Sequence, residues 1–203
     1  MMDILGETFN IHSTVQELYK KGDWCKILKT LEEVGQRCCE VLWIRPEQID
    51  LEFIKNAVEV KGLKRIVSVG CGCGLLEWLL QAATGVHVIG IEIDPNYWNS
   101  KYFNRTKLKY IPLLFPQDEG FNSALLDKNA VLLFCYFNNR KAFNKYIDKY
   151  LGSCVIIIGP GLDSGRHTDP QPFDVDFKKD WTLVDSKEIR DSKDFIAVYV
   201  RKI

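Results

Sequence analysis

Arg65-Ile-Val-Ser-Val-Gly-Cys-Gly-Cys-Gly-Leu-Leu-Glu77, followed by His87-Val-Ile-Gly-Ile-Glu-Ile-Asp-Pro95, is the most informative part of this chain about its fold. It contains a short apolar run, three glycines at alternate positions, a helical pattern and a second apolar run that ends in an acid. Two short apolar runs separated by a helical pattern are typical of a βαβ unit with parallel strands. The stretch predicts strands over 65–69 and 86–91, with a helix over 75–83 between them.

The residues that follow continue this alternation. The run at 130–137 is almost entirely apolar, as in a central strand of a parallel sheet that is covered on both faces. Pro112 lacks an N–H group, so a third strand around it belongs at a sheet edge. We expect further strands over 108–114, 130–137 and 154–158, helices over 95–103 and 140–150, and a loop with at most one short helix over 159–180.

The two ends of the chain differ from this central part. Apolar residues recur at helical spacing over 13–43, and Asp23 is a suitable N-cap where the pattern breaks, so two helices are expected there. A further helix is expected between Pro46 and Gly62. At the other end, 181–186, or as far as 189, and 194–201 read as two strands of an antiparallel hairpin at the sheet edge. The fold class is therefore α/β: a doubly wound, mostly parallel sheet with a C-terminal antiparallel hairpin and an N-terminal helical extension.

Composition narrows the range of partners. The 203 residues include 27 Lys and Arg against 27 Asp and Glu, so no basic field favours nucleic acid. Seven cysteines, an odd number mostly in apolar segments, predict a reduced, cytoplasmic (intracellular) protein. Cys71 and Cys73 lack further ligands at zinc-site spacing, so we expect no metal. No apolar run is long enough to span a bilayer, so we expect no membrane partner.

The glycines and the acid predict a nucleotide-type site. Gly70, Gly72 and Gly74 lie where the first strand must turn into a helix, and glycine permits both positive φ and close approach of a ligand to the backbone. The helix that follows offers unpaired N–H groups to an anionic group. Glu92, at the end of the second strand, is positioned to accept hydrogen bonds from ribose hydroxyls.

One residue separates two classes of cofactor. A dinucleotide fingerprint counted from Gly70 requires Gly or Ala at position 75, where this chain has Leu75. The pattern is G-x-G-x-G, and together with the strand that ends in Glu92 it resembles the class I S-adenosylmethionine-dependent methyltransferases. The resemblance is close over 65–95 and looser over most of 49–203.

The resemblance implies a division of the chain and a set of cofactor contacts. It implies a Rossmann-like methyltransferase domain over 49–203, preceded by the helical extension over 1–48, within one compact unit. The expected cofactor is S-adenosyl-L-methionine, with the glycine loop on its methionine part and the acid on its ribose. The predicted cofactor contacts are Gly70, Cys71, Gly72, Gly74, Glu92 and Ile93.

The chain also departs from the family pattern. Many members carry an acid two residues before the first glycine, where this chain has Ser68. Members that methylate nitrogen commonly carry Asn/Asp-Pro-Pro-aromatic after the fourth strand, and this chain has Cys135-Tyr-Phe-Asn-Asn139. A contact to adenine after the third strand could come from Asp118 or Glu119.

For the methyl acceptor, the predicted catalytic residues are Tyr136, Asn138 and His167. Topology brings Tyr136 and Asn138, at the end of the fourth strand, towards the cofactor side, although both could simply be structural there. His167 and Arg166 lie in the polar loop after the fifth strand, where they either serve the acceptor or are solvated. Glu77 either contacts the ligand or favours the helix dipole.

Three functions are compatible with these observations. The first is an S-adenosylmethionine-dependent methyltransferase acting on an unidentified small-molecule or protein acceptor. The second is a non-catalytic protein of the same fold that acts as a cofactor sensor or partner subunit, which Ser68 and the missing catalytic motif favour. The third is a nicotinamide-dependent oxidoreductase, which Leu75 and the terminal hairpin argue against.

Overall fold

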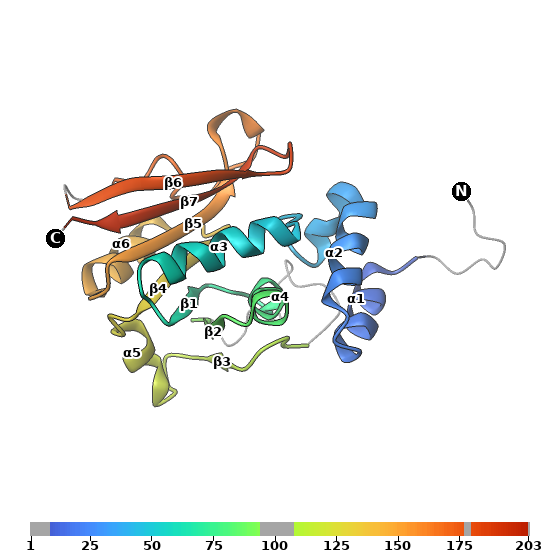
Figure 1. Cartoon of the computed structure of the whole chain (residues 1–203), viewed down its shortest axis with the longest axis horizontal. Coiled ribbons are helices and arrows are strands. Elements are labelled where there is room, and N and C mark those ends of the chain that lie inside the picture. The colour runs from blue at the N-terminus through green and yellow to red at the C-terminus, as the bar shows by residue number, and fades with distance from the viewer. Residues whose placement is uncertain (1–8, 94–107, 177–179, 203) are drawn as a thin grey trace.

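Seven strands form one sheet in the order β3-β2-β1-β4-β5-β7-β6 (Figure 1). The computed structural model describes residues 9–93, 108–176 and 180–202. Strands β1 to β5 are parallel, whereas β7 pairs antiparallel with both β5 and β6. The strands are β1 (Arg65–Val69), β2 (His87–Ile91), β3 (Leu113–Leu114), β4 (Ala130–Cys135), β5 (Cys154–Pro160), β6 (Trp181–Ile189) and β7 (Asp194–Arg201).

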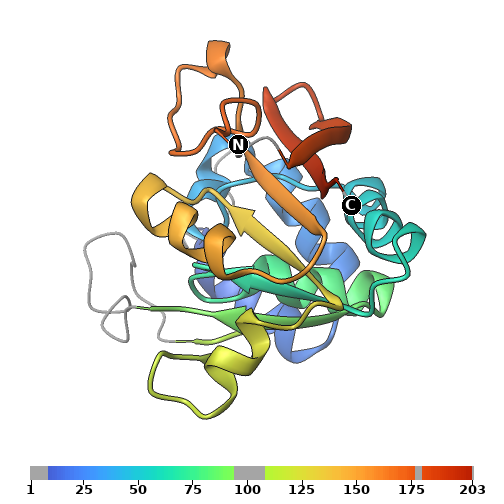
Figure 2. The same ribbon diagram turned by 90° about the vertical axis from the view of Figure 1, so that its left-hand side faces the viewer.

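Helices cover both faces of the sheet, and Figure 2 shows α3 (teal) and α6 (orange) on opposite sides of the strands. One face carries α1 (Ile11–Lys20), α2 (Trp24–Glu33), α3 (Gln48–Val60) and α4 (Leu75–Thr84). The other carries α5 (Gly120–Leu125) and α6 (Arg140–Lys149). Two short 3₁₀ helices, η1 (Gly35–Glu40) and η3 (Leu162–Ser164), lie in the connections. None of the helices in the described ranges combines the length and apolar character needed to cross a membrane.

Side chains alternate between the two faces of the sheet along each central strand, and both sets are buried because helices cover each face. In β4, Val131 and Leu133 face the core under α1–α4, whereas Leu132 and Phe134 face the core under α5 and α6. The same alternation in β1 directs Ser68 towards the α4 side, where it is fully buried. A polar side chain at that depth requires a hydrogen-bonding partner.

The predicted fold class and the antiparallel hairpin are confirmed, and the strands within the described residues follow the predicted order. The third strand lies at the edge as predicted, but it is shorter than 108–114. Before it, Tyr110 donates its backbone N–H to the carbonyl of Cys73 at 2.8 Å, so this part of the chain packs on the glycine turn and does not pair with β2. The helix predicted over 95–103 lies outside the described residues.

The N-terminal helices share a core with the sheet. The Asp23 side chain accepts a hydrogen bond from the backbone N–H of Lys26 at 3.2 Å, which confirms it as the N-cap of α2. Ile27 and Leu31 of α2 are fully buried in the cluster that also contains Leu79 of α4. The chain that leaves α2 is thereby held close to the carboxyl ends of the central strands.

Candidate functional site

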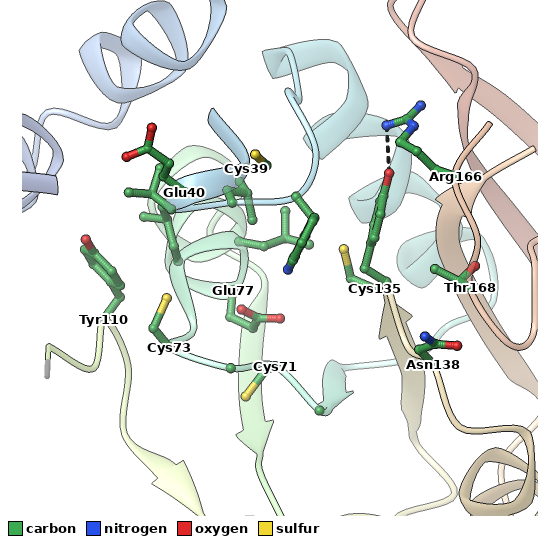
Figure 3. A pocket seen from close by; sticks show the side chains of 18 of the residues that line it. Cys39, Glu40, Cys71, Cys73, Glu77, Tyr110, Cys135, Asn138, Arg166 and Thr168 are labelled. Carbon is green, nitrogen blue, oxygen red and sulfur yellow. Dashed lines mark hydrogen bonds between the residues drawn. The ribbon is translucent and has the colours of Figure 1, made fainter. Parts of the chain in front are cut away.

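A cavity of about 630 Å³ opens at the carboxyl ends of β1 and β4, between the glycine turn and the N-terminal segment Cys39–Trp43. This is the edge of an open α/β sheet where ligands bind, and the volume suits a small-molecule ligand. In Figure 3, Cys73 and Glu77 point into it from the glycine turn and α4, with Cys39 and Glu40 on the opposite side. Its wall is completed by residues from α1, from the segment before β3, from the end of β4 and from the loop after β5, among them His12, Tyr110, Cys135, Tyr136, Asn138, Arg166, His167 and Thr168.

The glycine turn has the backbone that the sequence predicted. Gly70, Gly72 and Gly74 have φ values of 70°, 57° and 80°, in the left-handed region that favours glycine. Gly70 and Gly72 line the cavity. Gly74 is the N-cap of α4, and a Cβ there would lie 2.6 Å from Cγ1 of Ile111. The third glycine is therefore required for packing against the segment before β3.

Glu92 fastens the end of β2 to the glycine turn. Its carboxylate accepts a hydrogen bond from the backbone N–H of Gly72 at 3.2 Å and another from that of Ile93 at 2.9 Å. The side chain of Glu92 is buried, whereas Ile93 is 46% exposed. The acid that was predicted from its position after β2 thus contacts the glycine turn directly.

Glu77 and Ser68 form a buried pair beneath the cavity. The Ser68 hydroxyl donates to Oε1 of Glu77 at 2.6 Å, and Glu77 is 1% exposed. Burial raises the pKa of Glu77 to about 7, although the hydrogen bond from Ser68 opposes the shift. A carboxyl group two residues before the first glycine is common in the family, and here a helical carboxyl group lies against the serine at that position.

Three of the four cysteines that line the cavity, Cys71, Cys73 and Cys135, are neutral thiols. Burial raises the pKa of Cys73 to about 12 and the pKa of Cys71 and Cys135 well above the ordinary value. A nucleophilic cysteine needs a lowered pKa, so these side chains serve as small apolar wall residues. Within the described ranges, no group of three or more His, Cys, Asp and Glu side chains is arranged to hold a metal ion.

Tyr136 is tied into a network at the other end of the cavity. Its hydroxyl donates to Oδ1 of Asp194 at 2.7 Å and accepts from Nη1 of Arg166 at 2.7 Å, and Arg166 also contacts Oδ2 of Asp194 at 2.8 Å. Asp194 is 2% exposed. Burial, together with the hydrogen bond to Asp194, raises the pKa of Tyr136. Tyr136 has a φ of 50° and directly follows β4, which therefore ends at Cys135, two residues before the predicted end at 137.

The aromatic residues of the N-terminal helices divide into two groups. Tyr19 packs edge-on against Trp78 and Tyr110, with ring centroids 5.0 Å and 4.9 Å apart. Trp43 instead lines the cavity and stacks on Tyr136, with centroids 5.6 Å apart and an interplanar angle of 14°. The segment that carries Trp43 therefore covers the site, together with His12 of α1.

The predicted site residues fall into two groups. Six of them line the cavity: Gly70, Cys71, Gly72, Tyr136, Asn138 and His167. The described residues Gly74, Glu92 and Ile93 are not part of its lining. Asp118, one candidate for adenine, accepts from the backbone N–H of Phe115 at 2.7 Å, and Glu119 is the N-cap of α5. Asn139, next to Asn138, caps α6 through Ala142.

Sequence reasoning missed residues in the cavity wall and behind it. Thr168 is 2% exposed and lines it from the loop after β5. Asp194 is the first residue of β7, and nothing in its sequence neighbourhood indicates that it holds Tyr136 and Arg166. For Glu77 the sequence left ligand contact and the helix dipole as alternatives, and its side chain lines the cavity.

Known proteins match this chain in structure but not in sequence. No protein-family model and no curated protein matches the chain. A mutant of MtNAS crystallised with S-adenosylmethionine superposes with a TM-score of 0.54 at 16% identity, over 95% of this chain and 72% of that chain. MtNAS in complex with MTA and tNA gives 0.54 at 17% identity, over 95% and 70%. The O-methyltransferase from Bacillus cereus in complex with SAH gives 0.50 at 10% identity, over 98% and 94%.

The chain has the class I methyltransferase fold. At these identities the likeness establishes the arrangement of elements, and activity has to be argued from the cavity. The methyltransferase fold places the antiparallel β7 between β5 and β6, whereas the dinucleotide-binding fold has the order 3-2-1-4-5-6. The terminal hairpin, which argued against a nicotinamide-dependent oxidoreductase in the sequence, is thus a defining part of the sheet.

Proposed function

We propose that this protein is an S-adenosylmethionine-dependent methyltransferase that acts on a small-molecule or protein acceptor. The observation that carries the proposal is the left-handed glycine turn after β1, with Gly70 and Gly72 open to a cavity at the carboxyl end of the sheet. Neighbours of the same fold were crystallised with S-adenosylmethionine, with MTA and with SAH.

The residues present fit such a cofactor. Backbone at Gly70 and Gly72 carries no side chain that would fill the cavity, and Cys71 between them is a neutral thiol. We assign these three residues, with Gly74, Glu92 and Ile93 behind them, to cofactor binding. When bound, the cofactor would supply a methyl group activated by a sulfonium centre. The glycine turn would hold it, and Glu92 fixes the shape of that turn through Gly72.

The remaining wall residues would orient the acceptor. Methyl transfer from a sulfonium is an in-line displacement, so much of the catalysis can come from alignment and exclusion of water. Asn138 and His167 present polar side chains to the cavity. Tyr136 contributes its ring, stacked under Trp43, while its hydroxyl is held by Asp194 and Arg166. Its catalytic part is therefore to shape the acceptor side.

A non-catalytic protein of the same fold is the second candidate. The chain lacks the family's Asn/Asp-Pro-Pro-aromatic sequence, and the Tyr136 hydroxyl that occupies the equivalent region is engaged in a structural network. Such a protein would bind the cofactor and signal its presence to a partner.

Labelled methyl transfer to a cell extract tests the proposal. Wild-type protein should label an acceptor, and Gly72→Arg should abolish labelling because an arginine side chain would occupy the cavity. Gly22→Arg is the matched control, since Gly22 also has positive φ, at 69°, but lies in the turn between α1 and α2 with open space around it. Equal labelling by wild type and Gly72→Arg would refute catalysis in this cavity, and cofactor binding without any labelling would favour the second candidate.

A further inference from the structure

Two buried side-chain oxygens of the described residues lack a hydrogen-bond partner, and both line the cavity. They are Oε2 of Glu77 and Oγ1 of Thr168. Native structures rarely leave such groups unpaired, because each costs about 1–3 kcal/mol when it is removed from water without a partner. Oγ1 of Thr168 lies near the backbone of Gly159 in β5, so Oε2 of Glu77 is the atom that marks where a polar ligand group belongs.

The two atoms differ in what they select. A threonine hydroxyl both donates and accepts, so Thr168 can pair with water or with almost any polar group. An ionised carboxylate only accepts, and Oε1 of Glu77 is already occupied by Ser68. In this ionised form Oε2 requires a donor, and a charged donor would offset the cost of burying the carboxylate and lower the pKa that burial has raised.

The protein itself supplies no such cation to Glu77 in its described parts. The neighbours that act on this carboxyl group are Ser68, its own backbone and the acid Glu92. The basic side chains lining the cavity are His12, Arg166 and His167. Arg166 is held by Asp194, and Nε2 of His12 lies 4.0 Å from Oε2 of Glu40. Among the described residues, the buried acid at the start of α4 therefore has no basic side chain as its partner, and a ligand in the cavity could supply one.

We infer that Glu77 anchors an ammonium group of the ligand, so that the molecules bound in this cavity are amines or amino acids. The inference rests on the proposed function, because it concerns the same cavity, and it adds the chemical class that the cavity selects. The ammonium group has two possible sources: the amino-acid end of the cofactor, or a methyl acceptor that is itself an amine. In both cases the group donates to Oε2 while Ser68 keeps its bond to Oε1.

Glu77→Gln is the informative variant. Its amide oxygen can keep the hydrogen bond from Ser68, while its NH₂ group replaces Oε2 and turns an acceptor into a donor. Glu59→Gln is the matched control, because it makes the same change on α3, where Glu59 is exposed and pairs with Lys55 at 3.5 Å. Glu77→Met, of similar length, removes the carboxylate without introducing a donor and serves if the amide variant is unstable.

Calorimetric titrations distinguish the two sources. S-adenosylhomocysteine carries an amino-acid part and methylthioadenosine does not. If the cofactor supplies the ammonium group, Glu77→Gln should bind S-adenosylhomocysteine at least about 30-fold more weakly and methylthioadenosine equally well, as expected for the loss of a charged hydrogen bond. If the acceptor supplies the ammonium group, wild type and Glu77→Gln should have the same affinity for each nucleoside. In that case n-butylammonium should bind the S-adenosylhomocysteine complex of wild type but not that of Glu77→Gln.

Two results would overturn the inference, and they differ from each other. Wild type and Glu77→Gln could bind S-adenosylhomocysteine equally, with no difference towards n-butylammonium; the anchor would then be refuted while the proposed function stands. Wild type could instead bind neither nucleoside, in which case the proposed function and the anchor would both fail.

Discussion

The two sides of the cavity are built in different ways. The glycine-turn side, residues 65–93, is continuous in sequence, and its key contacts join β1, α4 and β2 over short distances along the chain: Ser68 to Glu77 and Gly72 to Glu92. The loop side, residues 135–169 together with Asp194, is assembled from segments far apart. Tyr136 meets Asp194 across 58 positions, and Asn138 forms a bridge with Asp169.

This difference explains which side can specify the cofactor and which the acceptor. A turn fixed by left-handed glycines and by a carboxylate on a backbone N–H has little freedom to vary. Loops that follow parallel strands can change in length and sequence without disturbing the sheet. We expect the glycine-turn side to serve a cofactor common to the fold and the loop side to carry whatever is particular to the acceptor.

The largest effect is expected at Gly74, on the glycine-turn side. Gly74→Ala places a Cβ 2.6 Å from Cγ1 of Ile111 in a backbone with φ of 80°, which should destabilise the fold by about 3 kcal/mol or more. Gly62→Ala is the control, since Gly62 has φ of 64° but open space around it, and should cost only about 1 kcal/mol. Urea denaturation of both variants measures the difference, and equal losses would show that the glycine turn tolerates side chains.

The next effect is the pH dependence that Glu77 introduces. Burial raises its pKa from 4.5 to about 7, so between these values the folded chain keeps a proton that the unfolded chain has released. Stability should therefore fall as pH rises from 4.5 to 7, by up to about 3 kcal/mol from this group, and level off above. Glu77→Gln should lack this part of the slope, whereas Glu59→Gln should keep it. Unfolding free energies measured from pH 4 to 8 test this, and parallel curves for all three proteins would contradict the burial of an ionisable Glu77.

The loop side should respond to loss of charge at Asp194. Asp194→Asn weakens the bonds to Tyr136 and Arg166 at a residue that is 2% exposed, and we expect a loss of about 2 kcal/mol. Asp191→Asn, at an exposed neighbouring position, should change stability by less than about 0.5 kcal/mol. Thermal unfolding compares the two, and a similar small effect for both would mean that the network does not hold the loop side.

The smallest effect on stability is expected for Trp43. The residue is 51% exposed and its main contact is the stack on Tyr136, so Trp43→Ala should cost about 1 kcal/mol or less. Leu162→Ala, at a side chain that is 75% exposed away from the cavity lining, is the control. The affinity for S-adenosylhomocysteine should fall in Trp43→Ala but not in Leu162→Ala, because Trp43 lies in the cavity wall. Unchanged affinity in Trp43→Ala would remove the N-terminal segment from the site.

The sequence predicts the glycine-turn side of the cavity better than the loop side. β1, α4 and β2 could be located almost to the residue, because each is set by its own periodicity and by glycines next to it. The glycine turn could be predicted for the same reason. The edge position of β3 followed from Pro112, but its length did not, because Tyr110 and Ile111 pack on the glycine turn.

The loop side could not be predicted in this way. Tyr136 and Asn138 were found from topology, but the engagement of the Tyr136 hydroxyl depends on Asp194, which reads in sequence only as the start of a strand. Thr168 is buried only because the loop after β5 folds over the cavity. Contacts between segments that are remote in sequence leave no local pattern from which to infer them.

Calorimetric titration of wild-type protein with S-adenosylhomocysteine and with NAD tests whether the glycine turn binds a single adenosyl cofactor, with Gly72→Arg and Gly22→Arg as the paired variants. We expect saturable binding of S-adenosylhomocysteine by wild type and Gly22→Arg, no binding by Gly72→Arg, and no binding of NAD by any of them. Binding of NAD without binding of S-adenosylhomocysteine, or equal binding of S-adenosylhomocysteine by Gly72→Arg and wild type, would contradict this expectation.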